Sequence, residues 1–121
     1  MPKKILVVED SKSYLFILTE TLKAQGFSVD SAENGEAGLE ATKSGKPDLI
    51  LLDITMPKMD GITMAKKVRE FDTSVPIIFL TNMSDFKNIS GALETAKDYI
   101  VKADTSVEDI VLKVKEKLCL K

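Results

Sequence analysis

Residues 49–53 read Leu-Ile-Leu-Leu-Asp, a run of four apolar residues that ends directly at a carboxylate. Runs this short and uninterrupted are typical of strands buried on both faces, as in a parallel sheet covered by helices. Outward from this segment, similar runs occur at Ile5–Val8, Ile77–Leu80 and, more loosely, Tyr99–Val101. A weaker strand with alternating apolar and polar residues is predicted at Phe27–Ser31. The sequence therefore predicts five strands.

The segments between these strands carry apolar residues at helical spacing. Near the end of the chain, Ser106 and Asp109 form a capping-box start for a helix. The apolar residues of that helix are Val107, Ile110, Val111, Val114 and Leu118. An earlier helix should end at Gly26, because glycine commonly follows the last helical turn. Its apolar residues are Leu15, Leu18 and Leu22.

Weaker stripes predict three further helices, at Ala37–Ala41, Met64–Phe71 and Phe86–Leu93. Five strands that alternate with five helices are typical of the α/β class. Because crossovers between parallel strands are right-handed, the expected fold is a doubly wound five-stranded parallel sheet with helices on both faces.

Composition limits both the size and the function of the molecule. A chain of 121 residues that is 44% apolar can build one core without disulfides or metals, so we expect a single domain over residues 1–121. Its net charge of −2 gives no positive electrostatic potential that would attract a polyanion, so direct nucleic-acid binding is not expected. The absence of His excludes Ser-His and Cys-His nucleophile pairs and the commonest zinc ligand.

Cysteine usage and hydropathy indicate the compartment. Cys119 is the only cysteine and cannot form a disulfide within the chain, which suits a reducing environment. No apolar run approaches the roughly 18 residues needed to cross a bilayer, and the apolar stretch near Met1 is too short for a signal peptide. We therefore expect a cytoplasmic protein without membrane insertion.

Polar residues follow the predicted strands at the points where the strands end. Glu9-Asp10 follows the first strand, Asp53 the third, Thr81 the fourth and Lys102 the fifth. Ligand sites of doubly wound sheets lie at this edge. Three clustered carboxylates raise one another's pKa and need a compensating cation, and oxygen ligands without His or Cys favour Mg²⁺. A hydroxyl and an ammonium opposite such a centre could hold phosphoryl oxygens.

Most of these residues also have a plainer interpretation when taken singly. Asp10 could be the N-cap of the following helix, Thr81 could satisfy a loop, and Lys102 could be a solvated surface charge. Tyr99 could belong to the core or its rim. Asp53 is harder to explain in this way, because a carboxylate at the end of an apolar strand is costly unless it is paired or used. Compatible chemistry at several strand ends favours a joint site.

The segment Asp53-Ile54-Thr55-Met56-Pro57-Lys58-Met59-Asp60-Gly61 closely resembles the phosphoacceptor loop of receiver domains of two-component response regulators. The similarity extends from Lys3 to about Leu118 and includes the stand-alone, chemotaxis-type members. The resemblance implies a sheet in the flavodoxin-like order 2-1-3-4-5. It also implies a phosphorylatable switch that receives its phosphoryl group from a sensor histidine kinase or a phosphotransfer protein. The switch would then bind a downstream target or relay the group.

The same resemblance implies a role for each site residue. Asp53 would be phosphorylated, and the protein would assist its own phosphorylation and dephosphorylation without being an enzyme in the usual sense. Glu9 would act through metal-bound water, Lys102 would hold the phosphoryl group, and Thr81 would move toward it. The remaining implied roles are Mg²⁺ coordination by Asp10, Asp53 and the Thr55 carbonyl, and an aromatic switch at Tyr99.

This chain departs from the family pattern at two positions. The family usually has a cis proline after its lysine, whereas Ala103 follows Lys102 here. A cis non-prolyl bond costs about 3 kcal/mol, which leaves this peptide either trans or strained. Asn82 stands where a very small residue is usual. By resemblance, Thr55 and Met83 flank the path of attacking water, and neither would orient it, so we expect a long-lived phosphorylated state.

Two other functions on the same fold serve as alternatives. A Mg²⁺-dependent phosphatase of the haloacid-dehalogenase type would need a second Asp two residues after the nucleophile, where this chain has Thr55. An FMN carrier would need a Ser/Thr/Gly-rich phosphate loop after the first strand. Glu9-Asp10 stands there instead and would repel a phosphate.

Overall fold

A parallel sheet of five strands forms the centre of the molecule. The computed structural model describes residues 2–82 and 99–119. The strand order is β2-β1-β3-β4-β5, and every neighbouring pair is parallel, which confirms the predicted topology. The strands are β1 Lys4–Val8, β2 Ser28–Ala32, β3 Leu49–Asp53, β4 Ile77–Thr81 and β5 Tyr99–Val101.

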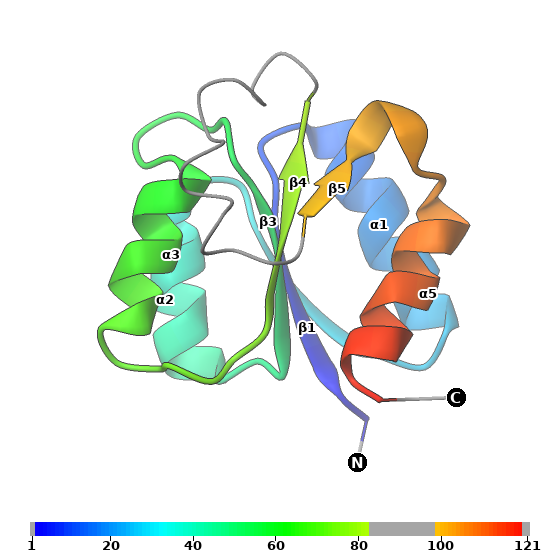
Figure 1. Ribbon diagram of the computed structural model, residues 1–121, viewed down its shortest axis with the longest axis horizontal. Helices are drawn as coiled ribbons and strands as arrows, with labels where there is room; N and C mark the ends of the chain where they lie inside the picture. Colours follow the sequence, from blue (N-terminus) through cyan, green and yellow to red (C-terminus); the bar gives the residue numbers. More distant parts are fainter. Residues whose placement is uncertain (1, 83–98, 120–121) are drawn as a thin grey trace.

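Helices cover both faces of this sheet. In Figure 1, α2 and α3 lie on one face, and α1 and α5 lie on the other. The helices in the described part of the chain are α1 Lys12–Ala24, α2 Gly35–Gly45, α3 Gly61–Arg69, the short 3₁₀ turn η2 Lys102–Asp104, and α5 Val107–Lys117. The helix predicted at 86–93 lies outside the described residues.

Local capping explains where the helices begin and end. The Ser106 hydroxyl accepts a hydrogen bond from the Asp109 amide at 3.1 Å, which confirms the predicted start of α5. Gly26 follows the C-cap of α1 with a φ of 94°, a conformation that favours glycine. Helix α3 begins three residues before the predicted start at Met64, because the Asp60 side chain accepts a hydrogen bond from the Thr63 amide at 2.8 Å.

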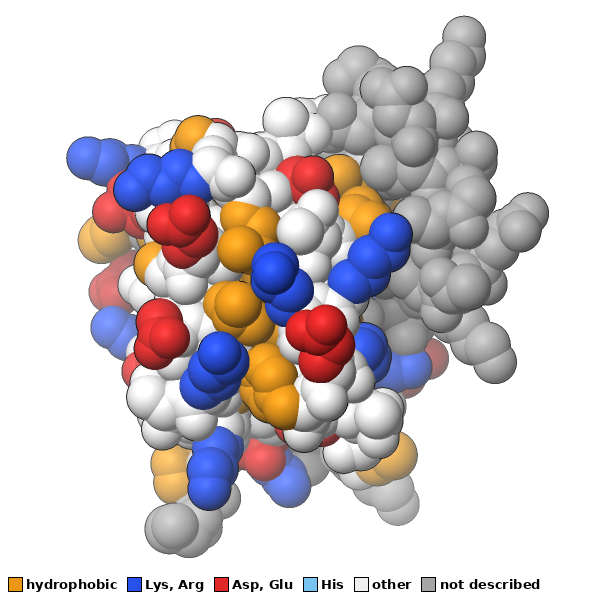
Figure 2. All heavy atoms as spheres, turned by 90° about the vertical axis from the view of Figure 1, so that its left-hand side faces the viewer, with side chains coloured by type: hydrophobic (Ala, Val, Ile, Leu, Met, Phe, Trp, Pro, Cys, Tyr) orange, Lys and Arg blue, Asp and Glu red, His pale blue; other side chains and the backbone are white. Residues whose placement is uncertain are grey.

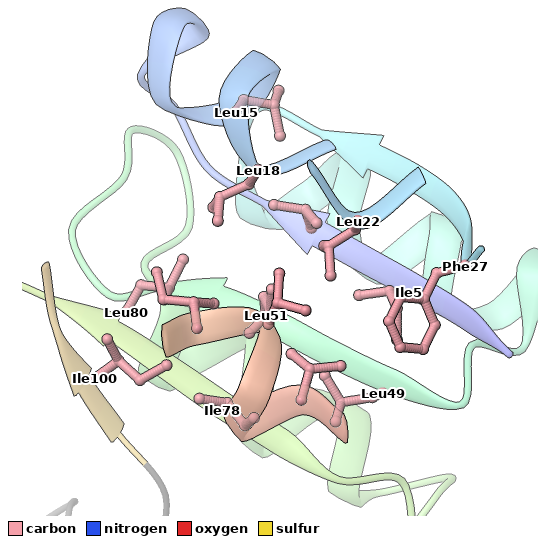
Figure 3. Packing of buried hydrophobic residues seen from close by; sticks show 14 residues of the cluster. Ile5, Leu15, Leu18, Leu22, Phe27, Leu49, Leu51, Ile78, Leu80 and Ile100 are labelled. Carbon is pink, nitrogen blue, oxygen red and sulfur yellow. The ribbon is translucent and has the colours of Figure 1, made fainter. Parts of the chain in front are cut away.

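The core consists of two apolar layers, one on each side of the sheet. Figure 3 shows the layer under α1 and α5, where Leu18 and Leu22 face strand residues such as Leu51. The opposite layer includes Leu52 and lies under α2 and α3. All five residues of β3 are buried, so both of its faces are covered, as the uninterrupted apolar run predicts.

The outer surface of α2 and α3 is mixed in character. Figure 2 looks onto this side and shows a column of apolar side chains with Lys or Arg and Asp or Glu side chains around it. Half-buried apolar residues that pack against the layer beneath include Leu39, Ile62 and Ala65. Within residues 2–82 and 99–119, no helix has the length and apolar character needed to span a membrane.

Candidate functional site

The parallel register brings the predicted site residues to one edge of the sheet. Asp53 pairs with Leu80 across β3 and β4, which places it next to Thr81. Thr81 in turn pairs with Val101 on β5, so Lys102 emerges at the same edge. Val8 is in register with Leu52, and Glu9-Asp10 therefore leaves β1 beside Asp53. Four strands thus carry the candidate residues to a common place.

Three carboxylates form a compact cluster there. Glu9, Asp10 and Asp53 each offer one oxygen, and these oxygens all lie within 4.8 Å of one another. Glu9 and Asp53 are buried, whereas Asp10 is exposed. The N-cap of α1 is Ser11, so the interpretation of Asp10 as a helix N-cap is wrong.

Lys102 is part of this cluster and is not a solvated surface charge. Its ammonium forms an ion pair with Glu9 Oε1 and lies 3.3 Å from Asp53 Oδ1. Only 16% of the lysine side chain is exposed. One ammonium faces three carboxylates, and Glu9 Oε2 and Asp53 Oδ1 are buried without accepting a hydrogen bond from the described residues. The cluster therefore has a deficit of positive charge.

The deficit of positive charge shifts the pKa values of Asp53 and Lys102. Burial, a hydrogen bond with Glu9 and the charge of Glu9 together raise the pKa of Asp53 to about 8, against the opposing effect of Lys102. Burial alone would lower the pKa of Lys102, but its interactions with Glu9 and Asp53 outweigh burial and raise that pKa. The pocket thus favours an extra proton or another cation.

Close backbone packing fixes the position of Asp53. The Ile54 amide donates to the Leu80 carbonyl at 3.1 Å, and the Gly61 amide donates to the Ile54 carbonyl at 2.8 Å. A Cβ atom on Gly61 would lie 2.2 Å from the Asp53 carbonyl oxygen, so only glycine allows α3 to start this close to β3. Thr55 is exposed beside this contact, and metal coordination by its carbonyl stays a prediction.

The predicted switch residues occupy the outer part of the same edge. Thr81 is buried, and its hydroxyl donates to the Asn82 carbonyl at 2.9 Å, so in this state it satisfies the loop. Tyr99 begins β5 opposite Phe79 with 37% of its surface exposed, a position on the rim of the core. Their roles in switching stay predictions.

The structure describes both positions at which the chain departs from the family pattern, Ala103 and Asn82. No peptide bond in the described part of the chain is cis, so the bond between Lys102 and Ala103 is trans. Asn82 is exposed. Met83, the second residue predicted to flank attacking water, lies outside the described residues.

Sequence reasoning missed one residue of this site, Tyr14. The Lys102 ammonium lies 5.0 Å from the centroid of the Tyr14 ring. The Tyr14 hydroxyl is buried and has no hydrogen-bond partner among the described residues. The available signal was its place in the first turn of the helix that follows Glu9-Asp10, one helical turn before the core residue Leu18.

The donor set of the pocket suits a hard divalent cation. The side-chain ligand atoms that the described residues offer there are carboxylate oxygens, and buried oxygens of Glu9 and Asp53 lack hydrogen-bond donors in the described structure. Mg²⁺ prefers such oxygen ligands and usually keeps several waters, for which exposed Asp10 leaves room. The residues present therefore fit Mg²⁺.

Comparison with known proteins places this chain in a family. The family model for the response regulator receiver domain matches residues 5–115. The chain is 40% identical over 103 residues to the alkaline phosphatase synthesis transcriptional regulatory protein PhoP of Bacillus subtilis, covering 84% of this chain and 43% of that protein. It is 38% identical over 115 residues to the chemotaxis protein CheY of B. subtilis, covering 91% of this chain and 96% of CheY. The chain thus spans less than half of PhoP and nearly all of CheY.

Solved structures agree with the sequence matches. A CheY-like receiver domain protein from Methanospirillum hungatei superposes with a TM-score of 0.88 at 28% identity, covering 98% of this chain and 94% of that one. CheY in a CheX-CheY-BeF3-Mg complex from Borrelia burgdorferi superposes with a TM-score of 0.86 at 31% identity. That match covers 98% of this chain and 90% of the other.

Proposed function

Because this chain belongs to the response regulator receiver domain family, and is therefore a phosphorylatable signalling switch, we propose that Asp53 is its phosphoryl acceptor. One observation carries this assignment. Asp53 is a buried carboxylate at the end of central strand β3, and its Oδ1 lies 3.3 Å from the Lys102 ammonium without accepting a hydrogen bond. An oxygen so placed is available to form a new bond.

The donor would be a phosphohistidine on a sensor histidine kinase or a phosphotransfer protein. An Asp53 carboxylate oxygen attacks the phosphorus, a new O–P bond forms, and the P–N bond breaks with its electron pair passing to the imidazole. Lys102 then exchanges its contact with Asp53 for a phosphoryl oxygen, and the Thr81 hydroxyl turns from the Asn82 carbonyl toward the same group. Tyr99 fills the space that Thr81 vacates, and the altered face binds a downstream target.

Glu9, Asp10, Asp53 and the Thr55 carbonyl are the groups that would hold Mg²⁺, with Glu9 acting through water. When bound, the ion supplies positive charge against the phosphoryl oxygens. The CheY structure that contains Mg in its complex supports this proposal by its likeness to the present chain. That structure also contains CheX, which supports the proposal that a protein partner reads the switch.

We also propose that residues 1–121 act as one receiver domain, since all five strands join one sheet. Its self-assisted phosphorylation and dephosphorylation, through Lys102, Thr81 and the metal ligands, belong to the same proposal. Family membership does not favour the phosphatase or FMN alternatives. The acidic residues after β1 and the presence of Thr55 in the acceptor loop also disfavour them.

The acceptor assignment is tested by incubating the protein with acetyl phosphate and Mg²⁺ and measuring its intact mass. We expect one acid-stable, base-labile phosphoryl group, and we expect Asp53→Asn to abolish it. Asp48→Asn, which changes a carboxylate just before β3 at the opposite edge of the sheet, is the matched control and should be labelled like the parent. Equal labelling of Asp53→Asn would overturn the assignment.

A further inference from the structure

Tyr14 joins the acidic cluster to the hydrophobic core. It lies in the first turn of α1 and packs against the apolar layer that Leu15 and Leu18 help to form. Its ring faces the Lys102 ammonium at 5.0 Å from the ring centroid. The ring is therefore held by the core on one side and contacts the site on the other.

Lys102 needs such a contact, because its own backbone restrains it weakly. A lysine side chain is long and flexible, and here it extends from η2, a turn of three residues with no buried member. The bond to Ala103 is trans, so the segment lacks the cis proline that is usual in the family. Contacts made by the ammonium must therefore fix where it lies.

Among the described residues, three groups lie close to that ammonium. Two are the carboxylates of Glu9 and Asp53, and the third is the Tyr14 ring. An ammonium is attracted to the face of an aromatic ring, and the attraction is stronger where water is excluded. With 16% of the Lys102 side chain exposed, this contact is largely shielded from water.

We propose that Tyr14 is a positioning residue whose aromatic face holds the Lys102 ammonium beside Asp53, ready to receive a phosphoryl oxygen. The ring performs this role and the hydroxyl does not, because the hydroxyl makes no hydrogen bond within the described structure. This inference rests on the proposed function, in which Lys102 holds the phosphoryl group.

The contact itself is tested by NMR on the metal-free, unphosphorylated protein. The Tyr14 ring current should shift the Lys102 ε-methylene protons upfield, with the resonance assigned by its loss in Lys102→Ala. Tyr14→Phe should keep the shift and Tyr14→Leu should remove it. An unchanged shift in Tyr14→Leu would overturn the proposal. This readout does not depend on phosphorylation, so it stays informative even if Asp53 is not the acceptor.

The functional consequence is tested by the rate of phosphorylation from acetyl phosphate with Mg²⁺. We expect Tyr14→Phe to stay within about twofold of the parent, whereas Tyr14→Leu should be about three- to tenfold slower. In the Lys102→Ala background, Tyr14→Leu should cause no further slowing, because the ring would have no ammonium to hold.

Matched variants separate positioning from packing. Phe16→Leu makes the same kind of change on the same helix at a side chain that is 65% exposed, and its rate should equal the parent's. If Tyr14→Leu does not fold by thermal melting, Tyr14→Met replaces it with an unbranched apolar side chain. Equal slowing by Tyr14→Leu with and without Lys102, or equal slowing by Tyr14→Phe and Tyr14→Leu, would overturn the proposal.

Discussion

At the amino-terminal edge of the sheet, polar groups of Lys4 and Asp72 have hydrogen-bond partners. The Lys4 amide donates to Asp48 Oδ2 at 2.8 Å, and its ammonium donates to the Gly45 carbonyl at 3.1 Å. Asp72 Oδ1 accepts hydrogen bonds from the Ser74 and Val75 amides, each at 2.9 Å. These backbone hydrogen bonds lower the pKa of Asp72, so they stabilise this carboxylate in its charged form.

The carboxyl-terminal edge is the opposite case. There Glu9 Oε2 and Asp53 Oδ1 are buried and accept no hydrogen bond from the described residues, and burial together with Glu9 raises the pKa of Asp53 to about 8. The charged form of Asp72 thus stabilises the fold, whereas the charged form of Asp53 destabilises it. A buried carboxylate that accepts too few hydrogen bonds is costly to keep, which makes this edge a candidate functional site on physical grounds alone. Replacing Asp72 and replacing Asp53 should therefore change the stability of the fold in opposite directions.

The two edges should differ most in how they make the stability of the fold depend on pH. The folded-state pKa of Asp53, about 8, lies above the ordinary value of 3.8, so the folded protein binds more protons between these values. Stability is therefore greatest at the acidic end and falls as pH rises toward 8. We expect the melting temperature of metal-free protein to fall by about 5 °C or more across this range. Asp53→Asn should flatten the profile, and an equally steep profile in that variant would contradict the account.

Metal binding should reduce the destabilisation that the acidic cluster causes at the carboxyl-terminal edge. Mg²⁺ relieves repulsion among Glu9, Asp10 and Asp53, and at one hundred times its dissociation constant it should stabilise the fold by about 2.7 kcal/mol. Asp10→Ala should be more stable than the parent without metal and should respond less to it. Thermal melts with and without Mg²⁺ measure both effects.

A matched variant at the opposite edge controls for general charge effects. Asp48→Ala removes a carboxylate that lies far from the cluster along the sheet, so its melting temperature should respond to Mg²⁺ as the parent's does. If Asp10→Ala binds Mg²⁺ as tightly as the parent, the acidic cluster is not the metal site.

The carboxyl-terminal edge should also control how long the phosphorylated state lasts. Hydrolysis of the acyl phosphate needs a water opposite the Asp53 oxygen, and neither Thr55 nor Met83 offers a group that would orient it. Thr55→Asn combined with Met83→Glu should speed phosphate loss about tenfold, or about 1.4 kcal/mol of barrier. The measurement is phosphate release from purified phosphorylated protein with Mg²⁺ present. An unchanged or slower rate would mean that these side chains do not control access of water.

The sequence predicted the arrangement at the carboxyl-terminal edge of the sheet much better than that at the amino-terminal edge. The runs before Asp53 and Thr81 are buried on both faces, so their apolar pattern determined the strands and placed the site residues. The partners of Asp72 could not be predicted in this way, because an exposed turn leaves no apolar pattern. Tyr14 was missed because its role depends on a contact with Lys102, 88 positions later in the chain, that no local periodicity encodes.

Boundaries and side-chain directions were also beyond the sequence. Helix α3 starts at Gly61 because the chain there packs against the Asp53 carbonyl, a tertiary contact that a hydrophobic stripe does not reveal. The direction of the Thr81 hydroxyl toward the Asn82 carbonyl depends on a rotamer in one state of the protein. The sequence thus predicted most residues of the candidate site but not Tyr14, whereas their pairing required the fold.

The smallest expected effect concerns the amino-terminal edge, where Asp72→Ala should cost about 1 kcal/mol by removing hydrogen bonds to the Ser74 and Val75 amides. The folded-state pKa of Asp72 is lowered, so its contribution is present above the ordinary value of 3.8 and is lost as pH falls through the lower folded value. Asp72→Ala should therefore reduce stability at neutral pH and flatten only the acid limb of the profile. Asp53→Asn should flatten only the limb between 3.8 and about 8. Melting temperatures of both variants from pH 2 to 8 test this separation, and a change in the same limb for both would show that the two edges do not differ as the structure indicates.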